Sequence, residues 1–368
     1  MAKPFTGRPF FGTFGLVFLA IAVLFVADMF LAKTERTESR VEAARLFEQG
    51  RVLMQRGKSA EAIKRIEDAV TIERGNRDYL RTLAQAQFAA GKTADAESTL
   101  AELLQSDSTD GPASLIMGRV LAKEGRFAEA ISYFHRAIYG QWNEGAAQNR
   151  LRVRFELIDL LSQRNSKEEL LAELLPIQDD APRDLKTRTR MGRLFLLAGS
   201  PARAADVFRG ILHDAPTSAD AYAGLGEAEF DRGNYRAAQR DFQTTLRLEP
   251  EDQATRRRLD VCIELIMLDP TMRGIGPAER FRRSLKLVEL TLDETNQCIG
   301  QNPSPELREL LDKAGKALTA RVGATQRSEV SESNLDLAEQ LWQARKKECK
   351  PPPAAESPLA LVLARLAQ

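Results

Sequence analysis

The sequence is nearly without histidine and poor in cysteine, the two residue types that most often hold transition metals. Its 368 residues include two histidines, His135 and His213, and three cysteines with no Cys-x-x-Cys pair. A metal site of this kind needs several such ligands at short spacing, so we expect no metal. Cys298 and Cys349 leave two alternatives open: idle thiols, or one disulfide in an oxidising compartment.

The chain also lacks an excess of charge of one sign. Its 53 basic residues stand against 52 acidic ones, for a formal net charge of +1. This balance argues against nucleic acid as a partner. The sequence has no Gly-rich phosphate loop and no nucleophile elbow. We therefore expect a protein that is not an enzyme, without cofactors and without a small-molecule substrate.

Aromatic residues and alternating strand-like runs are scarce, whereas alanine and leucine are abundant. Glycine and proline occur mostly singly, between stretches in which apolar residues recur at helical spacing. With 43% hydrophobic residues, the chain has enough apolar content to bury a core. These features predict an all-α fold.

One long hydrophobic run, residues 10–32, is apolar except for Thr13 and Asp28. About 20 such residues span a hydrocarbon core of ~30 Å as a helix, so we expect a transmembrane signal-anchor after a short tail, 1–9. A cleaved signal peptide is the alternative, because residues 20–22 have the small-residue pattern of a cleavage site. Cleavage there would leave an exposed apolar start, which favours the uncleaved anchor.

The charges around this run bear on its orientation. Lys3 and Arg8 precede it without any acid, whereas the helical linker that follows, residues 33–42, mixes both signs. A simple Lys/Arg count favours a cytoplasmic C-terminal side, while the unopposed positive N-terminus favours the opposite. We expect a single-pass protein of the cell (inner) membrane whose large C-terminal domain lies outside the cytoplasm.

A pattern of large and small residues recurs every 34 residues beyond this linker. Small residues such as Gly50 and Ala62 are expected where two antiparallel helices of one copy pack closest. A glycine follows each first helix, where a left-handed conformation ends it, and Asn165 replaces this glycine in a degenerate fourth copy. The glycines are Gly57, Gly91, Gly125, Gly199 and Gly233.

This pattern resembles the tetratricopeptide repeat family over about residues 43–252. The resemblance implies a right-handed α-solenoid in which stacked copies bury one another's apolar faces. The sequence departs from the family at the first motif position, often Trp, where the fourth and fifth copies have Arg154 and Arg188. The six copies are 43–76, 77–110, 111–144, 151–184, 185–218 and 219–252, with an interruption of phase at 145–150.

The chain continues beyond the repeats with further helical stretches. Residues 253–349 are expected to form a helical cap, which the end of a solenoid requires. The run Pro351-Pro352-Pro353 makes 350–356 a stiff spacer. Residues 357–368 are expected to form a short amphipathic helix, for which three alternatives remain: docking on its own solenoid, binding a partner's groove, or a frayed tail.

The resemblance also implies a concave groove, lined by the first helix of each copy, that binds peptides or helices of partner proteins. Projection of the helical phase predicts a mainly basic groove with aromatic residues, suited to acidic segments. A solvated charged face is the alternative. The predicted groove residues are Phe47, Arg51, Arg81, Phe88, Arg119, Lys123, Arg152, Phe155, Lys186, Arg193, Glu227 and Phe230.

Two functions follow from these expectations. The first is a membrane-tethered scaffold or adaptor that binds partner peptides in the groove, for example in envelope assembly or protein quality control. The second is a permanent structural or accessory subunit of a membrane protein complex, with the anchor and the C-terminal helices as fixed contacts.

Overall fold

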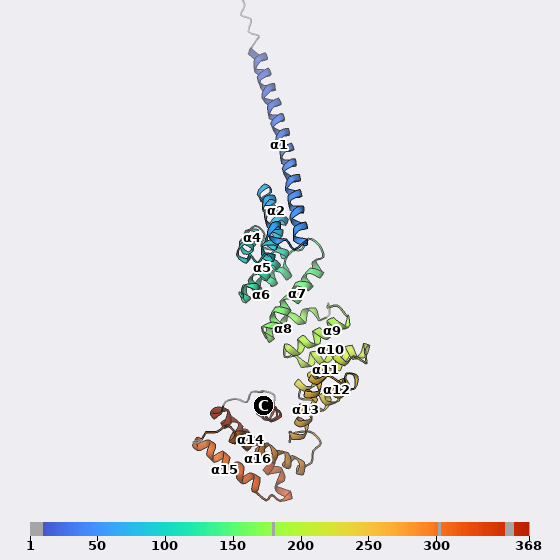
Figure 1. Cartoon of the computed structure of the whole chain (residues 1–368), viewed down its shortest axis with the longest axis vertical. Coiled ribbons are helices and arrows are strands. Elements are labelled where there is room, and N and C mark those ends of the chain that lie inside the picture. The colour runs from blue at the N-terminus through green and yellow to red at the C-terminus, as the bar shows by residue number, and fades with distance from the viewer. Residues whose placement is uncertain (1–9, 179–180, 301–302, 350–356, 368) are drawn as a thin grey trace, which may run out of the picture. The chain divides into compact units, whose positions relative to one another are not determined.

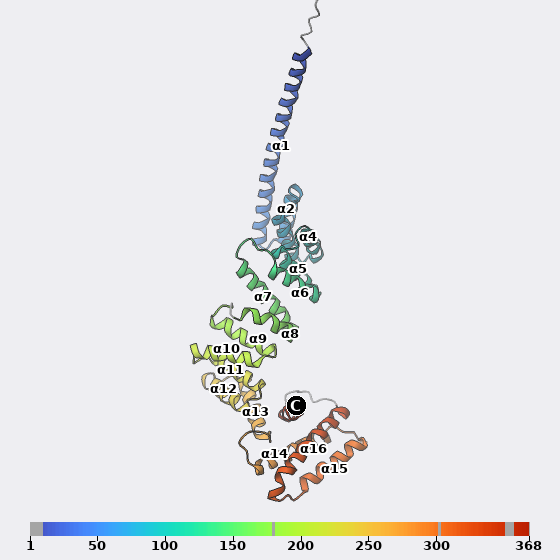
Figure 2. The ribbon, with the colours of Figure 1, turned by 180° about the vertical axis from the view of Figure 1, so that it is seen from behind.

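The computed structural model describes residues 10–178, 181–300, 303–349 and 357–367, without several side chains between residues 10 and 32. Every regular element in these ranges is a helix (Figure 1; Figure 2). The one β-type contact among them is an isolated parallel bridge between Asp110 and Gln141. The prediction of an all-α fold is confirmed, while the predicted tail 1–9 and spacer 350–356 lie outside the described residues.

The chain divides into two compact units, Met1–Leu160 (unit 1) and Leu161–Gln368 (unit 2), with the boundary inside α7 (Ala146–Gln163). Unit 1 is built from antiparallel helix pairs, and each pair packs on the next. The pairs are α1 (Phe10–Gln55) with α2 (Ser59–Ile72), α3 (Arg77–Ala89) with α4 (Thr93–Ser106), and α5 (Gly111–Lys123) with α6 (Phe127–Tyr139).

The turn inside each helix pair contains a residue in the left-handed conformation. In unit 1 the φ angle is +73° at Gly57 and +81° at Gly91, and unit 2 has the same conformation at Gly199 and Gly233. Asn165, which takes the glycine position in the degenerate copy, has φ +55°. Asparagine adopts this region more readily than other residues with a side chain, which explains the replacement. The predicted role of these positions is confirmed.

Small residues on the first helices make room for large residues on the second helices. A Cβ atom added to Gly50 would lie 2.5 Å from Cγ1 of Ile66, which is fully buried. The same atom on Gly118 would lie 3.3 Å from Cδ2 of Phe134. The two helices of a pair therefore approach closest at these glycines, as the small positions of the repeat predicted.

The first helices begin at capping side chains that the repeat pattern does not predict. The side chain of Asn76 accepts hydrogen bonds from the backbone N–H groups of Asp78 and Tyr79 at the start of α3. Asp110 accepts one from the N–H of Ala113, at 2.8 Å, in α5. Each cap satisfies an N–H group that has no partner within the helix.

Unit 2 continues with helix pairs but starts with an irregular one. The second helix of the fourth copy, α8 (Lys167–Leu174), has 8 residues and passes into a 3₁₀ turn at Leu175–Ile177, which contains Pro176. Regular pairs follow, with α9 (Leu185–Leu197) on α10 (Pro201–Asp214) and α11 (Ala219–Asp231) on α12 (Tyr235–Leu248).

The C-terminal helices share one hydrophobic core with the last helix pair. Phe242, Leu265, Leu287 and Leu341 are all fully buried in this core, and Leu363 near the C-terminus is 1% exposed. The helices are α13 (Gln253–Leu268), α14 (Pro277–Asn296), α15 (Pro305–Thr319), α16 (Arg327–Glu348) and α17 (Pro358–Leu366).

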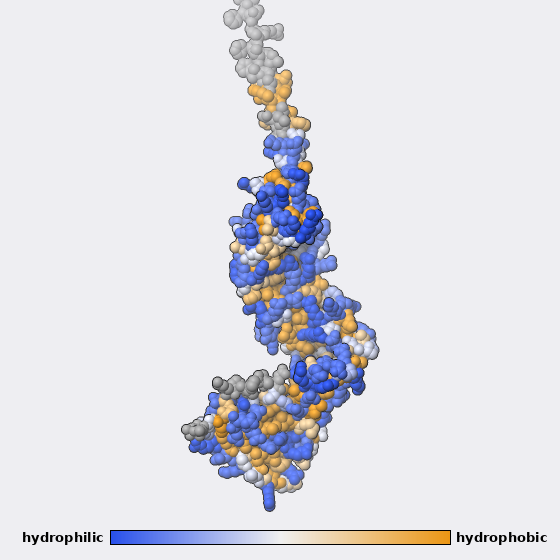
Figure 3. Space-filling view, in the orientation of Figure 1, coloured by the Kyte–Doolittle hydropathy of each residue, from blue (hydrophilic) through white to orange (hydrophobic). Residues whose placement is uncertain are grey.

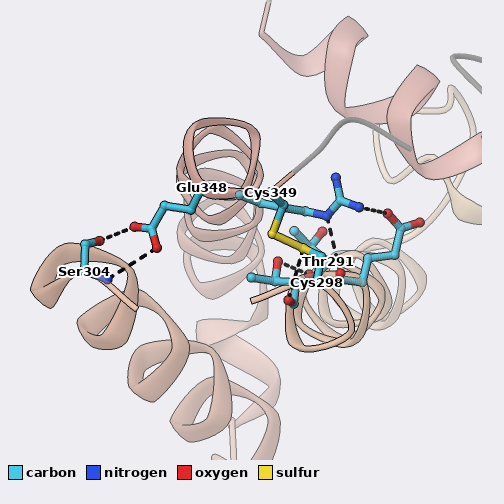
Figure 4. Close-up of a disulfide and its surroundings, with 8 residues drawn as sticks. Thr291, Cys298, Ser304, Glu348 and Cys349 are labelled. Atoms are coloured by element: carbon cyan, nitrogen blue, oxygen red, sulfur yellow. Dashed lines mark hydrogen bonds and ion pairs between the residues drawn. A yellow bond between two sulfur atoms is a disulfide. The ribbon is translucent and has the colours of Figure 1, made fainter. Parts of the chain in front are cut away.

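Cys298 and Cys349 form a disulfide between the residues that follow α14 and α16 (Figure 4). Their Cα atoms are 5.7 Å apart, within the usual range for a disulfide. Beside it, the Glu348 carboxylate accepts a hydrogen bond from the Ser304 hydroxyl. The structure thus places together the two cysteines for which a disulfide was one alternative.

Helix α1 runs without interruption for 46 residues, from the predicted anchor into the first repeat. Its large apolar side chains between residues 18 and 30 are exposed, among them Phe18 and Phe25 at 73% and 70% (Figure 3). Within the described part of the chain, no helix combines the length and the apolar content that a membrane span requires. The side chain of Asp28 and several others of the predicted anchor lie outside the described residues.

Candidate protein-binding surface

In unit 1 the predicted groove residues lie on the first helices α1, α3 and α5 and on α7. Arg81 of α3 approaches the buried Asp110 at the start of α5, with Nη2 and Oδ2 3.3 Å apart. Arg119 of α5 donates two hydrogen bonds to Glu156 of α7, Nε to Oε2 at 2.8 Å and Nη2 to Oε1 at 2.6 Å. These arginines therefore link consecutive first helices, and their charges are neutralised within the unit.

The predicted aromatic residues of unit 1 make the same kind of link. Phe47 of α1 stacks on Tyr79 of α3, with ring centroids 4.4 Å apart. Lys123 of α5 places its Nζ 5.2 Å from the ring centroid of Phe88 on α3. Stacking and cation–π contacts of this type stabilise by about 0.5–1.5 kcal/mol each. The aromatic positions thus pack between helices instead of standing alone in an open groove.

Unit 2 shows this arrangement again between α9, α11 and α13. Arg193 of α9 donates a hydrogen bond to Asp220 of α11 at 2.6 Å. Arg258 of α13 donates to Glu227 of α11 at 2.8 Å and lies over the ring of Phe230, 4.3 Å from its centroid. Phe230 is buried, at 8% exposed. Glu227, the one acidic residue of the predicted groove, is therefore paired with a basic residue that the prediction did not include.

A few predicted residues remain open to solvent. Arg152 on α7 and Lys186 on α9 are exposed, and neither has an ion-pair partner among the described residues. Arg51 forms only a surface ion pair with Glu48, one turn away, at 3.1 Å. Phe155 is half-buried on α7. A partner can reach these cations, and it can also reach Lys123 and Arg193, which are exposed although they contact Phe88 and Asp220.

Unit 1 also has a polar cavity of about 630 Å³ at the N-terminal ends of its first helices. Part of one wall is the loop at the end of the third copy, residues 141–144, and Asn149 in the first turn of α7 is the lining residue that lies in the predicted interruption, 145–150. That loop is fixed by a backbone hydrogen bond from Gly111 to Gln141, at 3.0 Å. The lining consists of Gly75, Asn76, Arg77, Asp78, Arg81, Asp107, Asp110, Pro112, Gln141, Trp142, Asn143, Glu144 and Asn149.

The side-chain amides around this cavity differ in their availability. Asn76 caps α3, and Asn149 donates to the backbone oxygen of Glu144 at 2.9 Å. Gln141 and Asn143 have no side-chain hydrogen bond within the described residues. An amide carries both a donor and an acceptor, which matches the backbone of an extended peptide. Repeat spacing could not reveal this site, because Gln141 and Asn143 lie in the loop that ends the third copy, outside the large and small positions of the pattern.

The ionisable groups of the described residues include a thiol and a carboxyl whose pKa values are strongly raised. No group of three or more His, Cys, Asp or Glu side chains there is placed to hold a metal ion. Burial raises the pKa of the Cys262 thiol to about 12, so this thiol stays protonated at neutral pH and is a poor nucleophile. Burial, with Glu229 nearby, also raises the pKa of Asp241 to about 6.

Comparison with known proteins places the repeats in a family. A model of the tetratricopeptide repeat family matches residues 53–119 and 195–259. A search among curated proteins gives no match.

Several solved structures are similar in fold at low sequence identity. YrrB, described as a TPR protein with an unusual peptide-binding site, is 16% identical with a TM-score of 0.43, over 53% of this chain and 97% of that one. The C-terminal part of a TPR repeat-containing protein from Cytophaga hutchinsonii is 12% identical with a TM-score of 0.45, over 66% and 95%. PilW, described as a widely conserved type IV pilus biogenesis factor, is 16% identical with a TM-score of 0.39, over 59% and 98%.

The family model thus matches one segment in each unit, 53–119 and 195–259. In both segments, antiparallel helices turn at a left-handed glycine, as at Gly57 and Gly233. The chain contains tetratricopeptide repeats.

Proposed function

We propose that this chain is a membrane-tethered scaffold that binds extended segments of partner proteins along the first helices of its repeats. The observation that carries the binding proposal is the polar cavity of unit 1, where Gln141 and Asn143 present unpaired amides beside the first helices. These amides bind the partner's backbone. Arg152 lies one helical turn beyond Asn149, on the same face of α7, and attracts an acidic side chain of the partner.

The binding proposal is tested with the full chain in detergent against a set of acidic and neutral peptides at low and high salt. Capture of acidic peptides should weaken as salt rises, because exposed charges are screened. Replacing Gln141 and Asn143 by Ala should weaken the binding of every peptide, whereas Arg152→Glu should weaken the binding of the acidic peptides only. The matched control is Arg236→Glu, the same charge change on an exposed arginine of α12. Equal capture by all variants would contradict the proposal.

The same experiment separates the second function, a permanent subunit of a membrane complex. In that case the chain captures no free peptide and is recovered from membranes only within a detergent-stable assembly. Roles such as envelope assembly or protein quality control require reversible capture instead.

The tether is supported by the exposed apolar side chains of α1 between residues 18 and 30 and by the unbroken helix that joins them to the first repeat. Exposure of so many contiguous apolar residues to water is unfavourable, and a bilayer removes that cost. The full chain should sediment with membranes after alkaline washing, and a chain without residues 1–32 should not. If both sediment equally, residues 10–32 are not the anchor.

We further propose that the C-terminal domain lies outside the cytoplasm, at the cell (inner) membrane. The disulfide between Cys298 and Cys349 supports this side, because disulfides persist in oxidising compartments. A reporter that is active only outside the cytoplasm, fused after Gln368, should be active. Activity of a cytoplasmic reporter at the same position would reverse the orientation.

A further inference from the structure

The last helix of the chain, α17, lies in an apolar groove of unit 2 formed by α13, α14 and α16. Three of its side chains, Leu359, Val362 and Leu363, are 5%, 2% and 1% exposed. Their spacing of i, i+3 and i+4 places them on one face of the helix. The groove therefore binds one amphipathic helix already, and it does so through a single apolar face.

A charged contact fixes the C-terminal end of α17 in this groove. Arg365 forms an ion pair with Asp269, with Nη1 and Oδ2 3.0 Å apart, and the Asp269 side chain is only 2% exposed. Asp269 also accepts hydrogen bonds from the backbone and hydroxyl groups of Thr271. A carboxylate so deeply buried favours a basic partner. The groove thus favours a helix that carries a basic residue as well as an apolar face.

The groove extends beyond the N-terminal end of α17 as a cavity of about 380 Å³. Its apolar lining comes from Met267 and Leu268 of α13, Leu290 of α14, and Pro358 and Leu359 of α17. The charged residues Glu264, Lys286 and Glu294 also line it. Met267 is 59% exposed, so much of its apolar side chain is accessible at this end of the groove. Helix α17 therefore leaves the apolar surface at this end uncovered.

The chain itself has no residue suited to this cavity in the stretch that precedes α17. That stretch, residues 350–356, is Lys-Pro-Pro-Pro-Ala-Ala-Glu and contains no large apolar side chain other than proline. Pro358 at the start of α17 also opposes extension by a full helical turn, because its ring would clash with the carbonyl group of residue 354. The α17 of a second copy has the same sequence and therefore also lacks a large apolar residue one turn before Leu359. A helix of another protein that carries a large apolar residue one turn earlier can cover both the groove and the cavity.

Helix α17 is short enough to be displaced. It has 9 residues, and isolated helices of this length are marginal in water, so its docking depends on the groove and on its covalent link. A covalent link of this kind acts as an effective concentration of about millimolar order for short flexible linkers. A free helix with one more apolar contact competes with such an occupant.

We propose that this groove is a helix-binding site for a partner protein and that α17 occupies it until the partner binds. The partner presents an amphipathic helix with apolar residues in the pattern of Leu359, Val362 and Leu363, a further apolar residue one turn earlier, and a basic residue for Asp269. The extra apolar residue enters the cavity beside Met267. This site is separate from the first-helix surface proposed above.

The test uses the full chain and a synthetic fluorescent helix as the probe. The probe has the sequence of residues 357–367 preceded by one helical turn that places a leucine four positions before Leu359. Leu363→Asp removes the buried face of α17, and its matched control is Ala364→Asp, the same charge at an exposed position of that helix. Leu363→Asp should bind the probe about tenfold more tightly than the control or the wild-type chain, because the competitor no longer docks.

A second substitution tests the cavity. Met267→Asp, introduced together with Leu363→Asp, should abolish the gain in probe affinity. A probe without its added leucine should bind the Leu363→Asp chain as weakly as the full probe binds the double variant. If Leu363→Asp fails to fold, a chain that ends at Cys349 replaces it and should show the same gain. Equal probe affinity of Leu363→Asp and Ala364→Asp would overturn the proposal. The proposal would also be overturned if the wild-type chain were a dimer and Leu363→Asp dissociated it, because the groove would then bind a second copy of the chain.

Discussion

Phe208 of α10 is fully buried in unit 2 between Gly192 of α9 and Gly224 of α11, which makes the packing of three helices depend on two missing side chains. A Cβ added to Gly224 would lie 2.2 Å from Cζ of this ring, and one added to Gly192 would lie 2.5 Å from it. Carbon atoms in contact are normally about 3.5–4.0 Å apart. Alanine at Gly224 therefore forces the ring or the helices to move.

The expected free energy follows from two opposing terms. Alanine is more favourable than glycine inside a helix by about 0.5–1 kcal/mol, whereas overpacking a buried position costs about 1–3 kcal/mol. Gly315 in α15 isolates the first term, because a Cβ there meets nothing within 4 Å. Gly315→Ala should stabilise its helix by about 0.5–1 kcal/mol, and Gly224→Ala should be less favourable than Gly315→Ala by about 1–3 kcal/mol.

Native-state hydrogen exchange of the full chain measures both effects, because protection reports the free energy of local opening. Gly315→Ala should increase protection of α15, and Gly224→Ala should decrease protection of α10 and α11. An equal increase in both variants would show that the Phe208 ring accommodates the methyl group, and the close-packing argument would then be wrong.

Three further predictions concern the turns, the pH dependence and the disulfide. Gly91→Ala should cost about 1–2 kcal/mol in urea unfolding from backbone strain alone, because φ is +81° there but a Cβ meets nothing within 4 Å. Burial raises the pKa of Asp241 from 3.8 to about 6, so the folded state binds its proton more tightly and stability should fall as pH rises from about 4 to about 6. In Asp241→Asn, the midpoint of urea unfolding should no longer fall over this pH range. Replacing Cys298 and Cys349 by Ser, at a sequence separation of 51, should cost about 4 kcal/mol in the chain-entropy model, and a reductant should then affect only the wild-type chain.

The helix pairs and their turns could be predicted from the sequence because each depends on residues close together in the chain. The left-handed turn at Asn165 could be placed by its register alone, although the residue is not glycine. The close approach of helices at Gly50 follows from the same register, since a small residue faces a large one whenever two helices of a pair cross. Local conformation and local packing thus carry most of the fold.

Other features depend on which helices lie next to one another and could not be predicted in this way. The basic groove was inferred from the helical phase of single residues, but Arg119 has its partner Glu156 in the next first helix. Arg258, the partner of Glu227, lies beyond the last repeat and so outside the pattern. The loop before Ala146 is another case, because its residues lie outside the large and small positions of the repeat on which the prediction relied.

The ion pairs between first helices change how a test of the groove must be designed. Arg119→Glu would place a second carboxylate beside that of Glu156, so any loss of binding could arise from altered helix packing. The pair is about one-third exposed on both sides, and such pairs contribute up to about 1 kcal/mol. Exchanging the two residues, Arg119→Glu with Glu156→Arg, should restore most of the unfolding free energy lost in the single variant. If the exchanged chain also regains peptide binding, this arginine acts through packing. If it regains stability and still fails to bind, the partner contacts Arg119 itself, and the basic groove extends beyond Arg152.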